Sequence, residues 1–499
     1  MPTQRPNILF IMSDQHVRKV AGCYGDPVAL TPNLDRLAAA GVAFDNAYCP
    51  SPICTPSRMS TMTGQWPHEQ ACWTLEDQLG SDRPTWMHAL GAGGYRPILA
   101  GRMHSVGPDQ LHGFAERDIG DCSPNWMGVK RQDLGILAGA QGPAAISLAR
   151  SGRGQSGYQV VDMATTEAAC ARLRSFGAAN RRGERTPFCL MVGLVLPHCP
   201  FVAWREDYDL FEGRVAMPAL PRPAADREHP WLARWRRICG IDEPDPKAVL
   251  RARTAYYGLV RRLDLMVGQM LDTLDAEGLS GETLVVYCSD HGEQIGERGL
   301  WWKNTFYDES AKVPLLMAWP GRIPAGGRCA RVVSMIDLNA TFVAATGAPA
   351  LPRSRGRNLL PIAIDPSRPW HDETFSEYVT DIVPHWTGPE ATQQRMIRSG
   401  RYKLVYVNGH RPLLFDLEND PFELEDRGED PAYADVRAAL TERVLAGWDP
   451  DAIAREVALR RREKDLLAAW GRSTQPASAL QFEISATDSW LEDEAAAAD

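Results

Sequence analysis

Residues 7–16 of this chain, with the sequence NILFIMSDQH, contain its clearest structural signal. Asn7 to Ser13 is a continuous apolar run of strand length, and it ends in the polar group Ser13-Asp14-Gln15-His16. A strand that is apolar on both faces is typical of the interior of a parallel sheet, where helices cover both sides. We therefore expect a buried parallel strand here, with Asp14 at its carboxyl end.

Two further apolar runs end in the same way. Residues 188–196 are followed by Pro197-His198, and residues 283–288 are followed by Ser289-Asp290-His291-Gly292. In open α/β sheets, ligands bind beyond the carboxyl ends of the parallel strands. The sequence therefore predicts that four polar side chains converge at one edge of the sheet: Asp14, His198, Asp290 and His291.

Helical patterns separate the predicted strands. Thr31 to Ala38 combines a capping residue, an early proline and helically spaced leucines, and it ends at Gly41. Val249 to Leu279 is a long amphipathic pattern, and shorter strands are expected around Phe44 and Ile98. Strands that alternate with helices indicate an α/β domain. We predict a large, mostly parallel sheet flanked by helices.

The pattern changes after about Ile364. Short strands are expected at residues 374–379, 394–398, 402–407 and 413–417, with Ser399-Gly400 as the hairpin turn between the second and the third. A helix is expected from about Ala432. This part of the sequence indicates a smaller C-terminal antiparallel α+β domain.

The 499 residues are enough for two or three domains. We predict a large domain over residues 1–365, a small antiparallel-sheet domain over 366–449 and a helical or irregular tail over 450–499. The tail is charged, helical near Arg455 to Trp470, and a candidate oligomerisation segment. Its acidic, alanine-rich end, Glu492 to Asp499, is expected to fray.

The composition argues against several classes of protein. A nucleic-acid binder normally carries a basic face, whereas the net charge here is −9. No apolar run approaches the roughly 18 residues of a membrane helix, and Ile8 to Met12 is too short for the core of a signal peptide. Eleven cysteines without framework spacing are typical of a reducing compartment. We expect a cytoplasmic protein that binds neither nucleic acid nor membranes.

A candidate nucleophile lies in a proline-rich loop. Residues 49–53 lead into Cys54-Thr55-Pro56-Ser57-Arg58 and a helix that closes at Gly64. A helix starting near Pro56 directs its unpaired N–H groups at Cys54, which stabilises an anion there and lowers the pKa of a thiol. Arg58, one turn further on, offers a fork of donors to a neighbouring oxyanion.

This segment resembles the Cys-x-Pro-Ser-Arg signature of the type I sulfatases, which are members of the alkaline phosphatase superfamily. The resemblance covers nearly the whole chain, including the opening strand with Asp14, the turn at 289–292 and the run Gly296 to Lys303. It implies that Cys54 is oxidised to formylglycine by a cysteine-oxidising system before the protein finishes folding. Gly101-Arg102-Met103-His104 and the run Gly107 to Phe114 look most like choline sulfatases, and bacterial arylsulfatases are also similar.

The resemblance also implies one divalent metal ion. Its ligands would be Asp14, Gln15, Asp290 and His291, together with the oxygen of modified Cys54. Many sulfatases have Asp in place of Gln15 and Asn in place of His291, and the variants found here look like those of choline sulfatases and phosphonate monoester hydrolases. Oxygen ligands suit hard cations, so we expect Ca²⁺ or Mn²⁺, with Mg²⁺ less favoured. The alternative is that Asp14 and Asp290 only cap helices.

The implied mechanism uses a hydrated formylglycine at position 54, one hydroxyl of which attacks sulfur in line. Arg58, Arg102 and Lys303 would neutralise the charge that spreads over the sulfuryl oxygens. His198 would be the general acid for the leaving alcohol, unless it is structural, and His104 would accept the proton of the second hydroxyl. Arg102 replaces the lysine usual in the family, which keeps the charge but puts a proton-transfer role of that residue in doubt.

The expected substrate is a small-molecule sulfate monoester, and its alcohol part stays open. Choline-O-sulfate and aryl sulfates are both candidates. Trp126 would face a quaternary ammonium by cation–π attraction, or it simply packs in the core. The alternatives are a phosphonate monoester or phosphodiester hydrolase with the same site, and a non-catalytic binding protein on this scaffold. A homo-oligomer is expected in either case.

Overall fold

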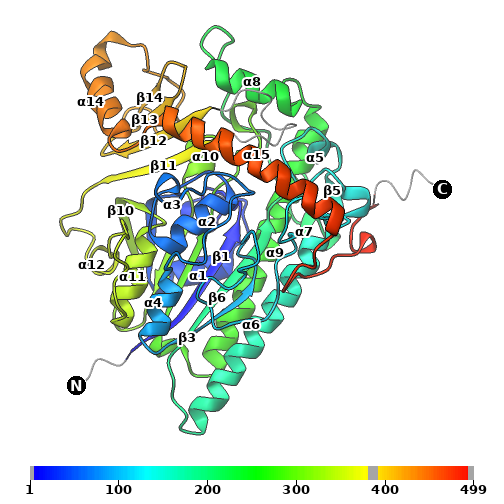
Figure 1. The fold of residues 1–499 in the computed structure, drawn as a ribbon, viewed down its shortest axis with the longest axis vertical. Helices are drawn as coiled ribbons and strands as arrows, with labels where there is room; N and C mark the ends of the chain where they lie inside the picture. The colour runs from blue at the N-terminus through cyan, green and yellow to red at the C-terminus, as the bar shows by residue number, and fades with distance from the viewer. Residues whose placement is uncertain (1–4, 380–391, 493–499) are drawn as a thin grey trace.

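The apolar run at the start of the chain forms β1 (Asn7–Asp14), and every residue of it is buried. The computed structural model describes residues 5–379 and 392–492. In it β1 lies inside a large sheet, paired in parallel with β6 (Phe188–Pro197) on one side and β8 (Thr283–Ser289) on the other (Figure 1). The three apolar runs of the sequence are therefore neighbouring strands.

The large sheet has eight strands. In spatial order they are β10 (Gly327–Ser334), β2 (Val42–Tyr48), β9 (Leu315–Ala318), β8, β1, β6, β3 (Arg96–Gly101) and β4 (Glu116–Arg117). Only β9 runs antiparallel to its neighbours among these described strands. The predicted mostly parallel sheet is confirmed.

Two groups of helices flank the large sheet (Figure 1). One consists of α2 (Cys54–Thr63), α4 (Trp86–Ala92) and α11 (Asp337–Thr346), and the other of α1 (Pro32–Ala40), α6 (Gly157–Arg181) and α9 (Pro246–Ala276). On the first side, Phe10 of β1 packs against both Trp86 and Phe342. The other described α-helices before the antiparallel sheet are α3 (Pro67–Gln70), α5 (Ile146–Ala149), α7 (Arg205–Tyr208), α8 (Pro230–Cys239), α10 (Asp308–Ala311) and α12 (Leu360–Ile364).

The predicted antiparallel sheet is also confirmed. Its strands, in order, are β11 (Glu373–Val379), β12 (Gln393–Ser399), β13 (Tyr402–Val407) and β14 (Leu413–Asp416). Gly400 lies in the turn between β12 and β13 with a positive φ of 54°, a conformation that glycine adopts readily. Helix α14 (Ala434–Leu445) packs on β12 and β13. The division of the chain at residues 365 and 449 stays a prediction.

The tail begins with α15 (Pro450–Thr474), which is longer than the expected helix and crosses the molecule from the antiparallel sheet toward β5 (Gly152–Gln155) (Figure 1). The chain then returns, and β15 (Trp490–Leu491) pairs with β5, which in turn pairs with β7 (Val202–Ala203). The tail therefore packs on the large α/β unit. Of the acidic end that is expected to fray, Glu492 to Asp499, the structure describes only Glu492, which forms an ion pair with Arg205. Residues 493–499 lie outside the described residues.

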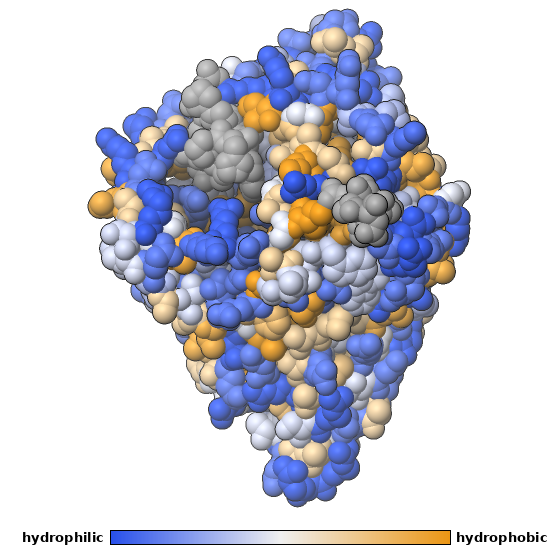
Figure 2. Space-filling model, turned by 90° about the vertical axis from the view of Figure 1, so that its right-hand side faces the viewer, coloured by the Kyte–Doolittle hydropathy of each residue, from blue (hydrophilic) through white to orange (hydrophobic). Residues whose placement is uncertain are grey.

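The surface is mixed in character. Across residues 5–379 and 392–492, no helix has both the length and the apolar character needed to cross a membrane. The face shown in Figure 2, toward which α15 runs, has hydrophobic patches among charged and polar side chains. The exposed hydrophobic side chains on α15 are Leu459, Leu466, Leu467 and Trp470.

Candidate active site

Four potential metal ligands meet at the carboxyl edge of the large sheet. The strand register places Ser13 beside Ser289 and Asp14 beside Pro197, so the polar residues that follow the strands are neighbours. One ligand atom of each of Asp14, Cys54, Asp290 and His291 lies within 4.8 Å of the others. All four residues are buried. Three of the four side chains that were expected to converge, Asp14, Asp290 and His291, are therefore neighbours in this cluster, and Cys54 is its fourth member.

Cys54 is the first residue of α2, two residues earlier than the predicted start at Pro56. Every side chain of this helix is buried, and the N-cap residue Ile53 offers no side-chain cap to the first N–H groups. Such unpaired N–H groups favour an anion at the helix start. The Cys54 sulfur lies 3.2 Å from Nε2 of His291 and 3.6 Å from Oδ1 of Asp14.

Two buried arginines hold the two carboxylates. Arg58 donates from Nε to Oδ2 of Asp290 at 2.8 Å and from Nη2 to Oδ2 of Asp14 at 3.2 Å. Arg102 donates from Nε to the same oxygen of Asp14 at 2.7 Å. Burial raises the pKa of Asp14, but the surrounding cations, Arg102 first, lower it well below its ordinary value. The carboxylate therefore stays ionised, and its Oδ1 is left to face Cys54 and His291.

The tautomer of His291 fits a metal ligand. Its Nδ1 lies 3.0 Å from the carbonyl oxygen of Gly292 and must donate to it, so the neutral ring presents a lone pair at Nε2. That atom lies 3.6 Å from Oδ1 of Asp14 and 3.5 Å from Oδ1 of Asp290. Burial lowers the pKa of His291, which keeps the ring neutral. Two carboxylate oxygens and an imidazole lone pair directed at one point suit a divalent cation.

Lys303 and Gln15 complete the surroundings of the thiol. The Lys303 ammonium donates to Oε1 of Gln15 at 2.7 Å and lies 3.1 Å from the Cys54 sulfur. Burial lowers the pKa of Lys303, but the charges of Cys54 and Asp14 raise it above its ordinary value, so the ammonium is retained. Gln15 lies in this group as predicted, with its amide oxygen bonded to Lys303. Its role as a ligand stays a prediction.

The two candidate histidines present different ring atoms. His198 Nδ1 lies 2.6 Å from the Cys199 carbonyl oxygen and donates to it, so Nε2 carries a lone pair. The ring is within hydrogen-bonding range of Cys54, and burial lowers the pKa of His198. His104 is partly exposed, and its Nδ1 lies 3.0 Å from Nη2 of Arg102.

Two carboxylates of the site were not among the predicted residues. Asp121 accepts from Nη1 of Arg102 at 3.4 Å and from the backbone N–H of His104 at 2.7 Å. Glu293 accepts a hydrogen bond from Nε2 of Gln15. Glu293 directly follows the turn 289–292, so its position in the sequence could have indicated that it lies in the site. Asp121 lies in an irregular stretch that no motif distinguishes.

Trp126 packs against the tail. Its ring meets that of Trp470 edge to face at 5.4 Å, and its indole N–H donates to the carbonyl oxygen of Ala477 at 3.2 Å. These contacts favour the packing interpretation of Trp126.

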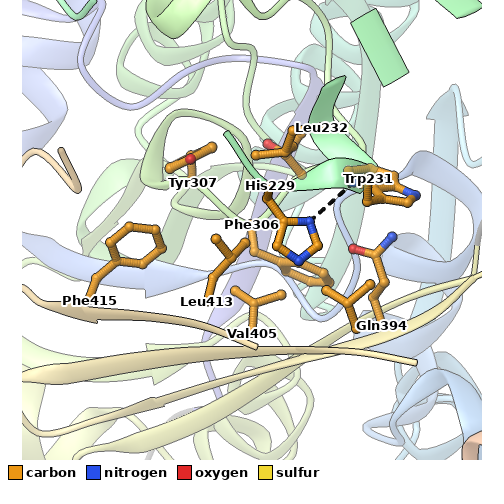
Figure 3. A pocket seen from close by; sticks show the side chains of 11 residues that line it. His229, Trp231, Leu232, Phe306, Tyr307, Gln394, Val405, Leu413 and Phe415 are labelled. Atoms are coloured by element: carbon orange, nitrogen blue, oxygen red, sulfur yellow. Dashed lines mark hydrogen bonds between the residues drawn. The ribbon is translucent and has the colours of Figure 1, made fainter. Parts of the chain in front are cut away.

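A largely apolar pocket lies elsewhere, between α8, residues 305–307 and the antiparallel sheet (Figure 3). His229, which caps α8, is held at both ring nitrogens: Nδ1 accepts from the Trp231 N–H and Nε2 donates to the Arg411 carbonyl oxygen. None of the residues that line this pocket belongs to the cluster of Asp14, Cys54, Asp290 and His291. This pocket is therefore separate from the candidate site.

Comparison with known proteins gives the class. The family model described as sulfatase matches residues 6–348, and one described as N-sulphoglucosamine sulphohydrolase, C-terminal, matches residues 296–447. The chain is 34% identical to a choline-sulfatase of Rhizobium meliloti (strain 1021), over 92% of this chain and 91% of that protein. It is 28% identical to human (Homo sapiens) arylsulfatase K, over 84% and 78% respectively.

Among solved structures, a phosphonate monoester hydrolase of Agrobacterium radiobacter is similar, with a TM-score of 0.72 and 25% identity over 91% of this chain and 96% of that one. The fold is thus that of the alkaline-phosphatase-like hydrolases. The chain belongs to the sulfatase family, whose members are hydrolases that act on sulfuric esters.

Proposed function

We propose that this chain hydrolyses a sulfate monoester with formylglycine, formed from Cys54, as its nucleophile and with one bound divalent metal ion. The observation that carries the proposal is the buried cluster of Asp14, Cys54, Asp290 and His291, whose ligand atoms lie within 4.8 Å of one another.

Asp14, Asp290 and His291 would hold the metal, with Gln15 as a further oxygen ligand once its amide leaves Lys303. When bound, the ion would act as a Lewis acid that lowers the pKa of the attacking hydroxyl. Ca²⁺ and Mn²⁺ are the preferred candidates because oxygen donors predominate, and Mg²⁺ is less favoured. The arginine contacts to the Oδ2 atoms support this, since they fix both carboxylates with Oδ1 facing the cluster.

The cationic side chains would bind the sulfuryl group. Lys303 lies 3.1 Å from the Cys54 sulfur, and Arg58 and Arg102 flank Asp14. Charge that develops on the sulfuryl oxygens is stabilised best by donors that are already fixed in place, as these are by buried contacts. His198, whose ring is within hydrogen-bonding range of Cys54, would be the general acid for the leaving alcohol in its cationic form, because the neutral ring has its proton on Nδ1 and a lone pair on Nε2.

The alcohol part of the substrate is open to direct test. The 34% identity to a choline-sulfatase favours choline-O-sulfate as the substrate. The packing of Trp126 against Trp470 argues against a binding site for the choline cation at Trp126. A phosphonate monoesterase is the second candidate, because the phosphonate monoester hydrolase shares the fold over nearly its full length. The test is a panel of choline-O-sulfate, nitrophenyl sulfate, sugar sulfates and phenylphosphonate, with protein coexpressed with a cysteine-oxidising system. A kcat/KM highest for phenylphosphonate would contradict the sulfate assignment.

The proposal requires the cysteine-oxidising system as a partner. Assembly into a homo-oligomer stays a prediction that sedimentation would test. A cytoplasmic location stays a prediction that cell fractionation would test.

A further inference from the structure

A cavity of about 450 Å³ lies where the outer strand of the large sheet meets the antiparallel sheet. It is lined by residues of β10, by Asn46 of β2, by Pro366 and Asp372, and by Arg398 and Gly400 at the end of β12. Three strands, β2, β9 and β8, separate β10 from β1. Because neighbouring strands lie about 4.8 Å apart, the cavity is roughly 19 Å across the sheet from β1. It is therefore separate from the candidate active site.

Three arginines line this cavity, Arg328 and Arg331 of β10 and Arg398 of β12. Among the described residues that line it, Asp372 is the only carboxylate, and both of its oxygens are engaged. Oδ2 accepts from Nη1 of Arg331 at 2.9 Å, and Oδ1 accepts from a backbone N–H of β10 at 2.8 Å. Asp45, which is not part of the lining, pairs with Arg328. The lining thus has an excess of cations, in a protein whose net charge is −9.

Arg398 is a buried cation, only 7% exposed. Its Nε donates to the hydroxyl group of Tyr48 at 3.3 Å, and its Nη1 donates to the carbonyl oxygens of Gly400 and Tyr402. All of these partners are uncharged. Within the part of the chain that the structure describes, Arg398 forms no ion pair and its Nη2 makes no hydrogen bond.

The residue next to Arg398 adds to this imbalance. Lys403 of β13 lies directly opposite Arg398 in the antiparallel sheet, and like charges in such a pair repel each other. The carboxylates of this region, Asp308 and Glu423, are already paired with Lys403. A buried charge that no anion neutralises is costly. An anion bound in the cavity would therefore stabilise Arg398.

We propose that this cavity binds the sulfate or phosphate group of a small organic anion, with Arg398 as the unpaired cation and Arg328 and Arg331 as further donors. A guanidinium presents a planar fork of N–H groups that matches the oxygens of such groups. The volume falls within the range of small-molecule sites, about 300–1,000 Å³, and leaves room for an organic part beside the oxyanion. The inference goes beyond the proposed function and does not depend on it.

The test is calorimetric titration with glucose 6-phosphate, inorganic phosphate and inorganic sulfate. Anions also bind at other cationic sites, so the parent is compared with Arg328→Met and Arg398→Met. The matched control is Arg322→Met, which removes the same charge from an exposed arginine that lies outside the cavity and stacks on Trp319. We expect the Kd for glucose 6-phosphate to rise at least about tenfold in the two cavity variants and to stay unchanged in the control.

Titration curves that are the same in the parent and in both cavity variants would overturn the proposal. If either inorganic ion bound the parent as tightly as glucose 6-phosphate, the organic part of the ligand would be refuted. Unfolding midpoints show which variants are folded during the titration. If Arg398→Met unfolds, Arg328→Met decides, because Arg328 lies in a more exposed part of the cavity. Binding is measured without turnover, so a parent that hydrolyses no sulfate ester would contradict the proposed function alone.

Discussion

Position 54 is a place where negative charge is favoured. Cys54 is 1% exposed, and its sulfur is bordered by the Lys303 ammonium and by His291. Coulomb attraction between charges about 4 Å apart is worth several kcal/mol at the effective dielectric constant near a protein site. An oxygen nucleophile generated at this position would therefore be stabilised by groups that are already in place.

The first prediction concerns the chemistry of Cys54. In an active preparation, we expect the intact mass to report replacement of the thiol by an aldehyde and a carbonyl probe to label the peptide that contains Cys54. Cys54→Ala should fold and be inactive, and Cys54→Ser should stall as the sulfated enzyme because it has no second hydroxyl with which to expel sulfate. An active preparation with fully reduced Cys54 would contradict the mechanism.

The second prediction concerns the metal. Asp14→Asn and Asp290→Asn each remove a charged ligand, so bound metal measured by elemental analysis should fall by more than about tenfold, along with activity. Asp162→Asn is the matched control: Asp162 is buried and accepts from the N–H groups of Val195 and Leu196, yet it lies outside the cluster. Full metal occupancy in either cluster variant would show that the ligand set is wrong.

Part of the site could be predicted because its residues follow strong patterns. Asp14 and Asp290 end apolar strands, and Cys54 and Arg58 lie in one short motif. Asp121 could not be predicted, because it reaches Arg102 and His104 from a loop without periodicity, through contacts that only the tertiary fold creates. The tautomers of the histidines were equally beyond the sequence, since they depend on which atom faces each ring nitrogen.

At the scale of elements, α1 is fastened to α9 by a buried carboxylate. Asp264 of α9 accepts from the backbone N–H of Leu34 at 2.8 Å and from the side chain of Asn33 at 2.8 Å. These bonds satisfy N–H groups at the start of α1 that have no partner within the helix. Burial raises the pKa of Asp264 from 3.8 to about 6, although these hydrogen bonds oppose the shift.

The third prediction follows from that shift. Because the folded state binds the proton more tightly than the unfolded state, this group lowers the free energy of unfolding as pH rises from about 4 to 7, by up to about 3 kcal/mol. Asp264→Asn keeps an acceptor oxygen but does not titrate. Relative to the parent, it should therefore gain stability between pH 4 and pH 7, as measured by urea unfolding. A constant difference between the two proteins over that range would argue against the raised pKa.

Long elements were predictable and short ones were not. β1, β6 and β8 are buried on both faces, so their sequences are continuously apolar. β5 (Gly-Arg-Gly-Gln) and β15 have only four and two residues, and they are strands through pairing that the tertiary fold creates, β5 with both β15 and β7. The sequence predicts a helix near Arg455 to Trp470, whereas α15 runs from Pro450 to Thr474 and continues through Gly471, a residue that usually weakens helices.

At the scale of the molecule, a buried ion cluster joins the antiparallel sheet to the large α/β unit. Lys403 of β13 is fully buried, forms ion pairs with Asp308 and Glu423, and donates to the carbonyl oxygen of Phe306 at 2.9 Å. Asp308 starts α10, five residues after Lys303 of the candidate site. The segment that carries Lys303 is therefore anchored by the second sheet.

The fourth prediction tests this anchor. Lys403→Met leaves the buried Glu423 without its ion-pair partner, whereas Asp308 keeps its pair with Lys312. Removing one partner of a buried pair typically costs about 3–5 kcal/mol. The control is Arg401→Met, two residues away. Arg401 is exposed, so its pairs with Asp416 and Glu418 should be worth no more than about 1 kcal/mol. We expect a large fall in the unfolding midpoint for Lys403→Met only. Similar midpoints in the two variants would show that the cluster contributes little.

The order in which the strands of the large sheet are synthesised determines how long Cys54 stays accessible before the protein folds. β1 is made first, but its neighbours β6 and β8 begin only at Phe188 and Thr283. At about 5–20 residues per second, the ribosome needs on the order of 10–50 s to extend the chain from Cys54 to β8. Until then the thiol has no sheet edge to close over it, whereas in the finished protein it is 1% exposed. The yield of active enzyme would thus depend on whether an oxidising enzyme modifies Cys54 before translation reaches residue 283. Slowing translation before that residue should raise the yield.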